Sequence, residues 1–379
     1  MKNSSVNLNR VAVKVGSNVI TKDDGSLNEE RMLRIVEDVA ILYKQGMEVI
    51  LISSGAVAAG RGEIVPSKKT NMIASKQVLA SIGQVKLMAK YQFLFGKYGI
   101  QAGQLLAAKE SFRDRRHYLN MKNCIMALLE NRVLPVVNEN DTVSVNELMF
   151  TDNDELSGLI SAMMDCESLI ILTNVDGIYN AAPGTPGAEL IRDIDYSVPE
   201  DPDSFISPVK SEFGRGGMLT KYSIARKIAS EGIDVYIANG NRDFIITDIL
   251  RGKDIPCTRI AGGSRKKNGV KKWLNHSDTF AKGAVYVNEG AKHALVQNKA
   301  TSLLMIGITR IDGSFRSGDI VRILDEGGNM IGLGKSQYES EKARMIIGEK
   351  QSRPFIHYDY LVINDGVREQ VNNRITEER

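Results

Sequence analysis

The stretch Val133-Leu134-Pro135-Val136-Val137-Asn138-Glu139-Asn140-Asp141 decides the fold class of this 379-residue chain. A short apolar strand runs directly into amides and carboxylates, and a second polar cluster, Asp152-Asn153-Asp154, follows a few residues later. Polar side chains crowded at the end of an apolar strand cost free energy unless they bind something. In open α/β sheets, ligands bind beyond the carboxyl ends of the strands. The stretch therefore predicts an α/β protein with a site for a small polar molecule carrying an amino group, a magnesium ion, or both.

Strands and helices alternate over the first two thirds of the chain. The predicted strands are nearly continuous apolar runs, and the predicted helices have apolar residues at helical spacing. Strands are predicted at 10–15, 49–52, 101–106, 133–137, 169–172 and 235–238, and helices after Asn28 and at 118–131, 155–164 and 218–229. This pattern predicts an open αβα sandwich whose mainly parallel sheet is covered on both faces.

The character of the sequence changes after about Ile260. The next dozen residues are rich in Gly and Lys, and the strands beyond Lys282 are short and punctuated by glycine, with a hairpin turn at Glu326–Asn329. Such a pattern is typical of a small β-rich domain. We expect a first domain over 1–261, a linker over 262–278, a β-rich domain over 279–357 and a polar tail over 358–379.

Composition and charge exclude several classes of protein. The chain is 42% hydrophobic and 25% charged, with a net charge of only +3, so neither wholesale nucleic-acid binding nor binding to anionic membranes is indicated. No apolar run is long enough to span a bilayer, and the first residues lack the apolar core of a signal peptide. The three cysteines lie far apart and form neither a disulfide framework nor a zinc pattern. We therefore predict a cytoplasmic protein without a membrane anchor.

Lys14 lies inside the first predicted strand and is followed by Gly16-Ser17. A lysine buried without a partner is costly, so two placements remain open: a ligand of a phosphate or carboxylate, or an outward-facing residue on an edge strand. The turn Ser53–Ala56 ends one strand and opens a helix, where backbone N–H groups suit an anion. On these residues alone, an ordinary capped turn is the simpler interpretation.

The segment Phe213–Lys221 is a glycine-rich loop that enters a helix. Glycines let a backbone approach a ligand, and a helix start attracts anions. Lys221 falls in the first helical turn, where a cation opposes the helix dipole, and this placement favours an anionic ligand. The basic residues of 265–272, next to Trp273, suit either an RNA-facing patch or a solvated loop, and we favour the loop.

Taken together, these segments resemble the glutamate 5-kinase family, a group of amino-acid kinases that open proline biosynthesis. The resemblance rests on an ordered set of motifs: Val13–Ser17, Ser53–Ala56, Ile73–Gln77, Pro135–Asp141, Asp152–Asp154 and Gly216–Lys221. Residues 282–348 resemble a PUA domain, the second module of many bacterial members. The resemblance therefore covers nearly the whole chain.

The resemblance implies an αβα sandwich of the amino-acid-kinase type, with ATP over one half of the sheet's carboxyl edge and the amino acid over the other. It implies transfer of the γ-phosphoryl group of ATP to the side-chain carboxylate of L-glutamate, with Mg²⁺ as the partner of the nucleotide. Because that carboxylate is already ionised at neutral pH, the reaction needs no general base. The site must align two anions and neutralise charge on the transferring phosphoryl group.

The resemblance also assigns site residues. Lys14 and Lys221 flank the phosphates, and Asp154, with Asp152 as the alternative, orients both lysines. The glutamate-binding positions are Ser54, Asp141 and Asn153, with Asn138 and Asn140 shaping the pocket and Asp141 pairing with the substrate ammonium group. The nucleotide positions are Lys14, Thr173, Asn174, Arg215, Gly216, Gly217, Met218, Leu219, Thr220 and Lys221. Asn174 and Arg215 depart from the Asp and Thr expected there, and no residue is assigned as a metal ligand.

The family further implies feedback inhibition by proline, a homo-oligomer that is a dimer or a tetramer, and handover of the labile product to glutamyl phosphate reductase. Residues 60–75 are a candidate lid or inhibitor-sensing element. The nearest alternative is an amino-acid kinase acting on aspartate, acetylglutamate, carbamate or a nucleotide. The alternative from another class is an RNA-binding protein that acts through its C-terminal domain. The low net charge argues against RNA binding, and we expect a structural or regulatory role for that domain.

Overall fold

The protein divides into two compact units, Met1–Lys266 and Lys267–Arg379. The computed structural model describes residues 10–22, 24–113, 115–144, 153–181, 183–197, 217–263, 281–297, 301–350, 353–364 and 367. The linker expected at 262–278 and the tail expected at 358–379 lie largely outside these ranges, so the finer domain limits stay predictions.

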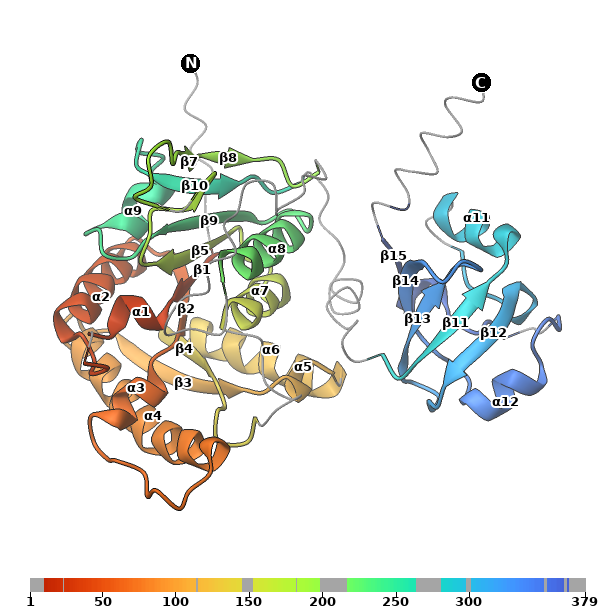
Figure 1. The fold of residues 1–379 in the computed structure, drawn as a ribbon, viewed down its shortest axis with the longest axis horizontal. Coiled ribbons are helices and arrows are strands. Elements are labelled where there is room, and N and C mark those ends of the chain that lie inside the picture. Colours follow the sequence, from red (N-terminus) through yellow and green to blue (C-terminus); the bar gives the residue numbers. More distant parts are fainter. Residues whose placement is uncertain are drawn as a thin grey trace. The chain divides into compact units, whose positions relative to one another are not determined.

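The first unit is built on an eight-stranded sheet, drawn edge to edge in Figure 1. In spatial order its strands are β3 (Gln101–Ala107), β4 (Val133–Glu139), β2 (Glu48–Ser53), β1 (Arg10–Val15), β5 (Ser168–Thr173), β9 (Asp234–Asn239), β10 (Cys257–Ile260) and β8 (Asp193–Ile194). The strands from β3 to β9 pair in parallel, and β10 runs antiparallel to β9. The prediction of a mainly parallel sheet is confirmed, and each predicted strand overlaps an observed one.

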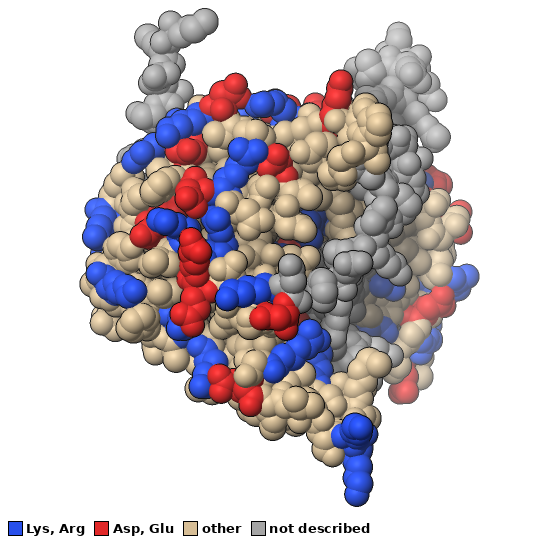
Figure 2. Space-filling view, turned by 60° about the vertical axis from the view of Figure 1, so that its left-hand side comes forward, with Lys and Arg blue, Asp and Glu red and all other residues tan. Residues whose placement is uncertain are grey.

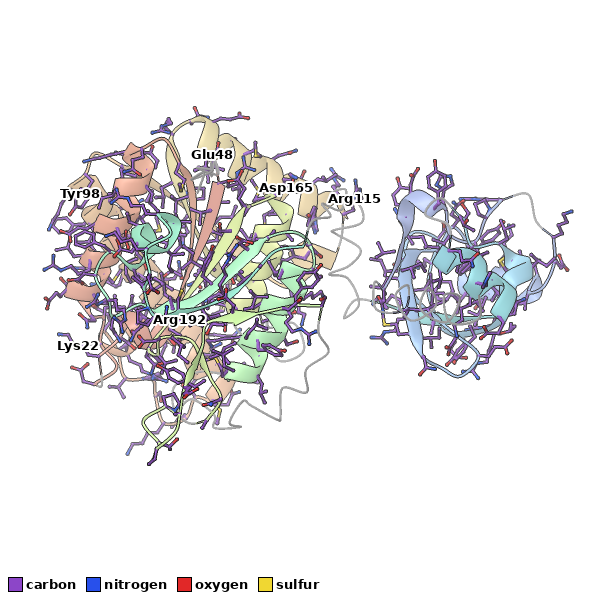
Figure 3. All side chains as sticks on the ribbon, turned by 90° about the horizontal axis from the view of Figure 1, so that it is seen from above. Lys22, Glu48, Tyr98, Arg115, Asp165 and Arg192 are labelled. Atoms are coloured by element: carbon purple, nitrogen blue, oxygen red, sulfur yellow. The ribbon has the colours of Figure 1, made fainter. Side chains whose placement is uncertain are left out.

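Helices cover both faces of this sheet (Figure 1). One layer contains α1 (Ser17–Ile20), α2 (Glu29–Lys44), α3 (Ala56–Arg61), α4 (Met72–Gly96) and α9 (Ile245–Leu250). The other layer contains α5 (Glu110–Arg113), α6 (Arg115–Glu130), α7 (Asn153–Met163) and α8 (Met218–Ala229). Figure 3 shows the two layers from above, with Tyr98, just after α4, on one side of the sheet and Asp165, just after α7, on the other. A two-stranded hairpin, β6 (Ile178–Tyr179) and β7 (Leu190–Ile191), completes the described part of this unit.

Strand β1 lies in the middle of the sheet, between β2 and β5. Its residues Val11, Val13 and Val15 belong to the core that also contains side chains of α2 and α4. Because side chains alternate along a strand, Lys14 points to the other face, toward α7. Lys14 is only 5% exposed, so the structure decides against an outward-facing lysine on an edge strand.

The long helix α4 was not predicted from the sequence. It begins at Asn71, whose side chain accepts a hydrogen bond from the Ala74 amide (2.8 Å). Helix α4 has apolar side chains on its exposed side as well, including Val85 and Phe93, which are 68% and 61% exposed. An amphipathic helix is recognised in a sequence by apolar residues on one side and polar residues on the other. Because both sides of α4 carry apolar residues, its sequence lacks this contrast.

Glycine lets α4 lie directly against α3. A Cβ added at Gly83 would lie 1.8 Å from the Ala56 carbonyl oxygen, and one added at Gly60 would lie 2.0 Å from the Leu79 carbonyl oxygen. No side chain fits between backbones at that distance. The crossing fixes α4 against the helix that begins at the end of β2, and so places one face of α4 beside the strand ends.

The second unit is a five-stranded sheet in the order β12-β11-β13-β14-β15. Its elements are β11 (Gly283–Val287), α11 (Glu289–Gln297), β12 (Ile308–Gly313), β13 (Ile320–Leu324), β14 (Met330–Lys335), α12 (Ser340–Met345) and β15 (Leu361–Ile363). The predicted hairpin joins β13 and β14, which pair antiparallel, and Gly328 has the positive φ of +82° that such a turn favours. The β-rich prediction is confirmed, although the helices of this unit were not predicted. No helix in the described ranges of either unit combines the length and apolar character required to cross a bilayer.

Candidate active site

Three charged side chains from separate parts of the sequence meet beyond the carboxyl end of β1. The Nζ of Lys14 lies 2.5 Å from Asp154 Oδ1, and the Nζ of Lys221 lies 2.9 Å from Asp154 Oδ2. Lys14 comes from the end of β1, Asp154 from the first turn of α7, and Lys221 from the first turn of α8. The structure thus brings together all three residues that were predicted to be catalytic.

This cluster is buried and holds two ammonium groups around one carboxylate. The Asp154 side chain is fully buried, and the side chains of Lys14 and Lys221 are 6% and 12% exposed. Burial by itself raises the pKa of the Asp154 carboxyl, but the two ammonium groups outweigh it and hold that pKa below its usual range. Two ammonium groups thus converge on one carboxylate. Cationic donors gathered at a buried position suit an anion such as a phosphate group.

Next to this cluster, Asn153 gathers the predicted substrate-side residues. Its Nδ2 donates to Ser54 Oγ (2.8 Å), to the Ser53 carbonyl oxygen (3.0 Å) and to Asn138 Oδ1 (3.0 Å). Its own Oδ1 is buried and has no hydrogen-bond partner among the described residues. A buried acceptor without a partner costs free energy, and a bound N–H donor would satisfy it.

Asp141 also lies at this edge of the sheet, but its partner was not foreseen. Its Oδ1 lies 2.6 Å from the Nζ of Lys76, in the second turn of α4. The neighbouring Gln77 Nε2 donates to the Thr142 carbonyl oxygen at 2.7 Å. Asn140 directs its side chain into the same turn, where Thr142 Oγ1 donates to it (2.5 Å), and it contacts no other predicted site residue in the described ranges.

Helix α4 forms one wall of this substrate-side region, and its polar residues are what the sequence reasoning missed. Gln84 Oε1 accepts from Asn138 Nδ2 at 2.8 Å, and Tyr91 shares a buried hydrogen bond of 2.8 Å with Ser53 Oγ. Burial raises the pKa of Tyr91 to about 12, although its bond to Ser53 acts in the opposite direction. The only signal in the sequence was the motif Ile73–Gln77, which carried part of the resemblance but had no role attached to it.

The predicted nucleotide-side residues lie at the ends of β5 and α8. Thr173 is buried at the end of β5, and the adjacent Asn174 is exposed. Asp176, which follows, receives two hydrogen bonds from Arg242, at 3.0 and 3.1 Å, and one from Asn239 at 3.0 Å. These bonds, chiefly the one from Arg242, hold the pKa of Asp176 below its usual value. Asp176, Asn239 and Arg242 were not predicted from the sequence.

Helix α8 begins immediately after Gly217, which has no side chain to accept a hydrogen bond from the first N–H groups of the helix. The predicted residues Met218, Leu219 and Thr220 form its first turn, and their backbone N–H groups lack intrahelical acceptors. Arg215, Gly216 and Asp152 lie outside the described residues. In the ranges that the structure describes, no group of three or more His, Cys, Asp or Glu side chains is arranged to hold a metal ion.

Two protein-family models match this chain. The model of the amino acid kinase family matches residues 9–239, and the PUA domain model matches residues 283–355. The chain belongs to the amino acid kinase family.

Curated relatives of this chain include glutamate 5-kinases. The relative from Bacteroides thetaiotaomicron is 53% identical over 93% of this chain and 98% of its own length, and the one from Chlorobaculum tepidum is 46% identical over 93% and 97%. Among solved structures, X-ray structures of isopentenyl phosphate kinase match 66% of this chain and 100% of theirs, at 20% identity and a TM-score of 0.47.

Proposed function

We propose that this protein is an ATP-dependent glutamate 5-kinase, which transfers the γ-phosphoryl group of ATP to the side-chain carboxylate of L-glutamate in the first step of proline biosynthesis. One observation carries the proposal: a buried cluster in which Asp154 holds the ammonium groups of Lys14 and Lys221, beside the amide-lined region around Asn153. The first is suited to a transferring phosphoryl group, and the second to a small polar acceptor. The names of the relatives support the same reaction.

In the proposed mechanism, the chain contributes alignment and charge rather than proton transfer. The acceptor carboxylate is already ionised near neutral pH. Phosphoryl transfer then depends on holding the attacking oxygen in line and on neutralising negative charge as it moves. Lys14 and Lys221 supply that charge from two sides, and Asp154 holds both ammonium groups in place before the substrates arrive.

The substrate would lie over β1, β2 and β4. Ser54, Asn153 and Asp141 are its proposed contacts, with Asp141 taking the ammonium group, and Asn138 and Asn140 shape the walls. Asn153 is held by three acceptors, so it is positioned before the substrate binds. Such pre-positioning lowers the entropic cost of aligning the acceptor carboxylate.

The nucleotide would lie over β5, β9 and the start of α8, contacting Thr173, Asn174 and residues 215–221. The N–H groups of the first turn of α8, which lack intrahelical acceptors, suit its phosphates. Both Asp154 oxygens face lysines, which leaves no carboxylate in the cluster free for a metal. Mg²⁺ is therefore proposed to arrive with ATP, held by phosphate oxygens, where it would offset phosphate charge.

The direct test is a hydroxamate assay with purified protein, Mg-ATP, L-glutamate and hydroxylamine, which traps acyl phosphates. We expect hydroxamate that requires both ATP and glutamate. The same assay with aspartate, acetylglutamate, carbamate and nucleoside monophosphates separates the alternatives within the family, since an acetylated nitrogen has no charge for Asp141 to pair with. Absence of glutamate-dependent hydroxamate would contradict the proposal.

Four further properties belong to this proposal. Proline inhibits the enzyme, since it resembles a cyclised glutamate and fits the glutamate-binding region. The candidate proline-sensing element is residues 60–75, which comprise the end of α3, a loop and the start of α4. The protein works in the cytoplasm as a homo-oligomer, and it passes its labile product to glutamyl phosphate reductase. Addition of proline to the hydroxamate assay tests the inhibition, and light scattering of the purified protein tests the homo-oligomeric state.

The PUA domain is proposed to have a structural or regulatory role rather than an RNA-binding one. On the face drawn in Figure 2, which is mainly that of the first unit, lysine and arginine side chains are interspersed with aspartate and glutamate, and the net charge of the whole chain is only +3. Mixed charge of this kind gives weak attraction to a phosphate backbone. Salt-dependent binding of structured RNA by the full-length protein would argue for the alternative.

A further inference from the structure

The ion pair between Lys76 and Asp141 has no place in the mechanism described so far. It joins α4 to the turn after β4, with 2.6 Å between Nζ and Oδ1, and the two side chains are 28% and 14% exposed. In the other two lysine pairs found for this helix the acidic partner is more exposed: the side chains of Lys86 and Glu63 are 54% and 41% exposed, and those of Lys90 and Glu29 are 26% and 65% exposed. The Lys76 pair is partly enclosed at the substrate-side edge of the sheet.

Each member of this pair keeps unused bonding capacity directed away from the other. An ammonium group has three donors and a carboxylate can accept several hydrogen bonds. Within the described residues, Lys76 Nζ contacts only Asp141, and Asp141 Oδ2 has no partner. The pair thus presents one free anionic acceptor and free cationic donors side by side.

The backbone on both sides of the pair is held firmly. Gln77, the next residue of α4, donates to the Thr142 carbonyl oxygen at 2.7 Å, and Gln84, two turns further along, bonds Asn138 at 2.8 Å. The close crossing of α3 and α4 at Gly83 fixes the helix itself. The two charges are therefore presented at a set spacing, which is the condition for selective recognition.

We propose that Lys76 is a substrate-binding residue that recognises the α-carboxylate, while Asp141 Oδ2 binds the neighbouring α-ammonium group. This inference rests on the proposed function and names the part of the substrate that the pair recognises. The head of a free α-amino acid carries one positive and one negative charge on adjacent atoms. Placed opposite the pair, it matches both charges, and the assembly stays neutral overall, so no unpaired charge is buried.

This arrangement predicts which molecules the site rejects. A substrate without the α-carboxylate leaves Lys76 unmatched, and one without the α-amino group leaves Asp141 Oδ2 unmatched. Sites built for a charged group reject analogues that lack it, because their own polar atoms then stay unpaired. Selectivity for the α-carboxylate would thus come from α4, which the sequence analysis did not place in the site, and selectivity for the α-amino group from Asp141.

The test compares Lys76→Met, which keeps the side-chain length without the charge, with Lys86→Met as the matched control on the same helix. For each, kcat/KM is measured with Mg-ATP and three acceptors: L-glutamate, glutarate, which lacks the amino group, and 4-aminobutyrate, which lacks the α-carboxylate. Loss of one hydrogen bond to a charged group corresponds to roughly a ten- to hundredfold change. We expect Lys76→Met to lose that factor with glutamate and with glutarate, but to change little with 4-aminobutyrate, while Lys86→Met matches the wild type throughout.

An equal loss with all three acceptors would overturn the inference, because Lys76 would then only hold α4 to the strand ends. No change with any acceptor would overturn it as well. Lys76→Arg keeps the charge and should restore a large part of the glutamate activity, and a thermal melt of each variant shows that the fold is intact. Wild-type protein that is inactive with glutamate would instead reject the proposed function, so the two failures are distinguishable.

Discussion

Replacing Asp154 by Asn tests the organisation of the charged cluster. The change keeps the shape of the side chain but removes the single negative charge that faces Lys14 at 2.5 Å and Lys221 at 2.9 Å. An ion pair at 2.9 Å is worth about 6 kcal/mol at an effective dielectric constant of 20, and desolvation offsets part of this. Removing one partner of a buried pair costs about 3–5 kcal/mol, and we expect the free energy of unfolding to fall by that amount.

The effect of Asp154→Asn on catalysis combines two opposing terms. Removing a negative charge beside the phosphates favours ATP binding, whereas releasing the lysines misplaces the charges that stabilise the transition state. Loss of one such positioned group costs about 10²- to 10³-fold in kcat. We therefore expect kcat to fall by at least about 100-fold, while KM for ATP stays constant or decreases.

The same variant predicts the pH dependence of stability. Because the folded protein holds the pKa of Asp154 below its unfolded value of about 3.9, the ionised carboxylate stabilises the fold above that pH. This contribution is lost as the pH falls below about 4 toward the folded-state pKa. The stability difference between wild type and Asp154→Asn should be constant above about pH 5 and should shrink below pH 4.

Urea unfolding at several pH values and steady-state kinetics measure these effects. Asp165→Asn is the matched control, because Asp165 pairs with Lys122 at 3.2 Å but is 53% exposed. Surface pairs of this kind contribute about 0–1 kcal/mol, so the control should retain both stability and activity. A variant at position 154 with kcat within about threefold of wild type would refute the claim that this carboxylate organises the lysines.

Three further predictions follow from the same contacts. Lys14→Ala and Lys221→Ala should each lower kcat by about 10²–10³-fold in the hydroxamate assay, because each removes a positive charge from the transition state; near-wild-type rates in both would show that the roles are wrong. Tyr91→Phe should lower the free energy of unfolding, measured in urea, by about 1 kcal/mol, because it deletes one buried hydrogen bond. It should also raise KM for glutamate by a few fold. An unchanged free energy of unfolding would contradict this prediction. Gly83→Ala should lower the melting temperature by well over 5 °C or prevent folding, since its Cβ would lie 1.8 Å from a backbone oxygen. Gly96→Ala is the control on the same helix: no atom lies within 4 Å of the new Cβ, so this variant should be neutral or stabilising. Equal melting temperatures of the two variants would contradict the close crossing of α3 and α4.

Helices and strands could be predicted wherever their buried residues recur in the sequence with helical or strand spacing. Strand β1 was placed at the residues where it is observed, Arg10–Val15, and α8 at Met218–Ala229, because apolar runs and helical spacing mark both. Helix α4 could not be placed, since its exposed side also carries apolar residues such as Val85. Local periodicity reports the contrast between buried and exposed sides, and it fails where that contrast is small.

Part of the candidate site was predictable from the sequence, but the residues that α4 contributes and the contacts that they make were not. Lys14 and Lys221 were singled out because charged groups in strands and at helix starts require partners, and their grouping around Asp154 was implied by the family resemblance. The pairing of Asp141 with Lys76 was not foreseen, because 65 positions separate them and the contact depends on how α4 crosses α3. A contact that depends on the packing of two helices leaves no local signal in either segment.

The central claim is that the side-chain carboxylate of glutamate attacks the γ-phosphorus of ATP. The most direct test is to measure whether an oxygen atom of that carboxylate appears in the released phosphate. L-Glutamate carrying ¹⁸O in both side-chain carboxylate positions is incubated with the protein, Mg-ATP and hydroxylamine, and the inorganic phosphate is analysed by mass spectrometry. If the carboxylate attacks the γ-phosphorus, the bridging oxygen leaves with the phosphate when hydroxylamine attacks the acyl carbon. We predict one ¹⁸O per phosphate released and one retained in the hydroxamate. Phosphate without ¹⁸O would show that water, and not glutamate, is the acceptor, and would contradict the account.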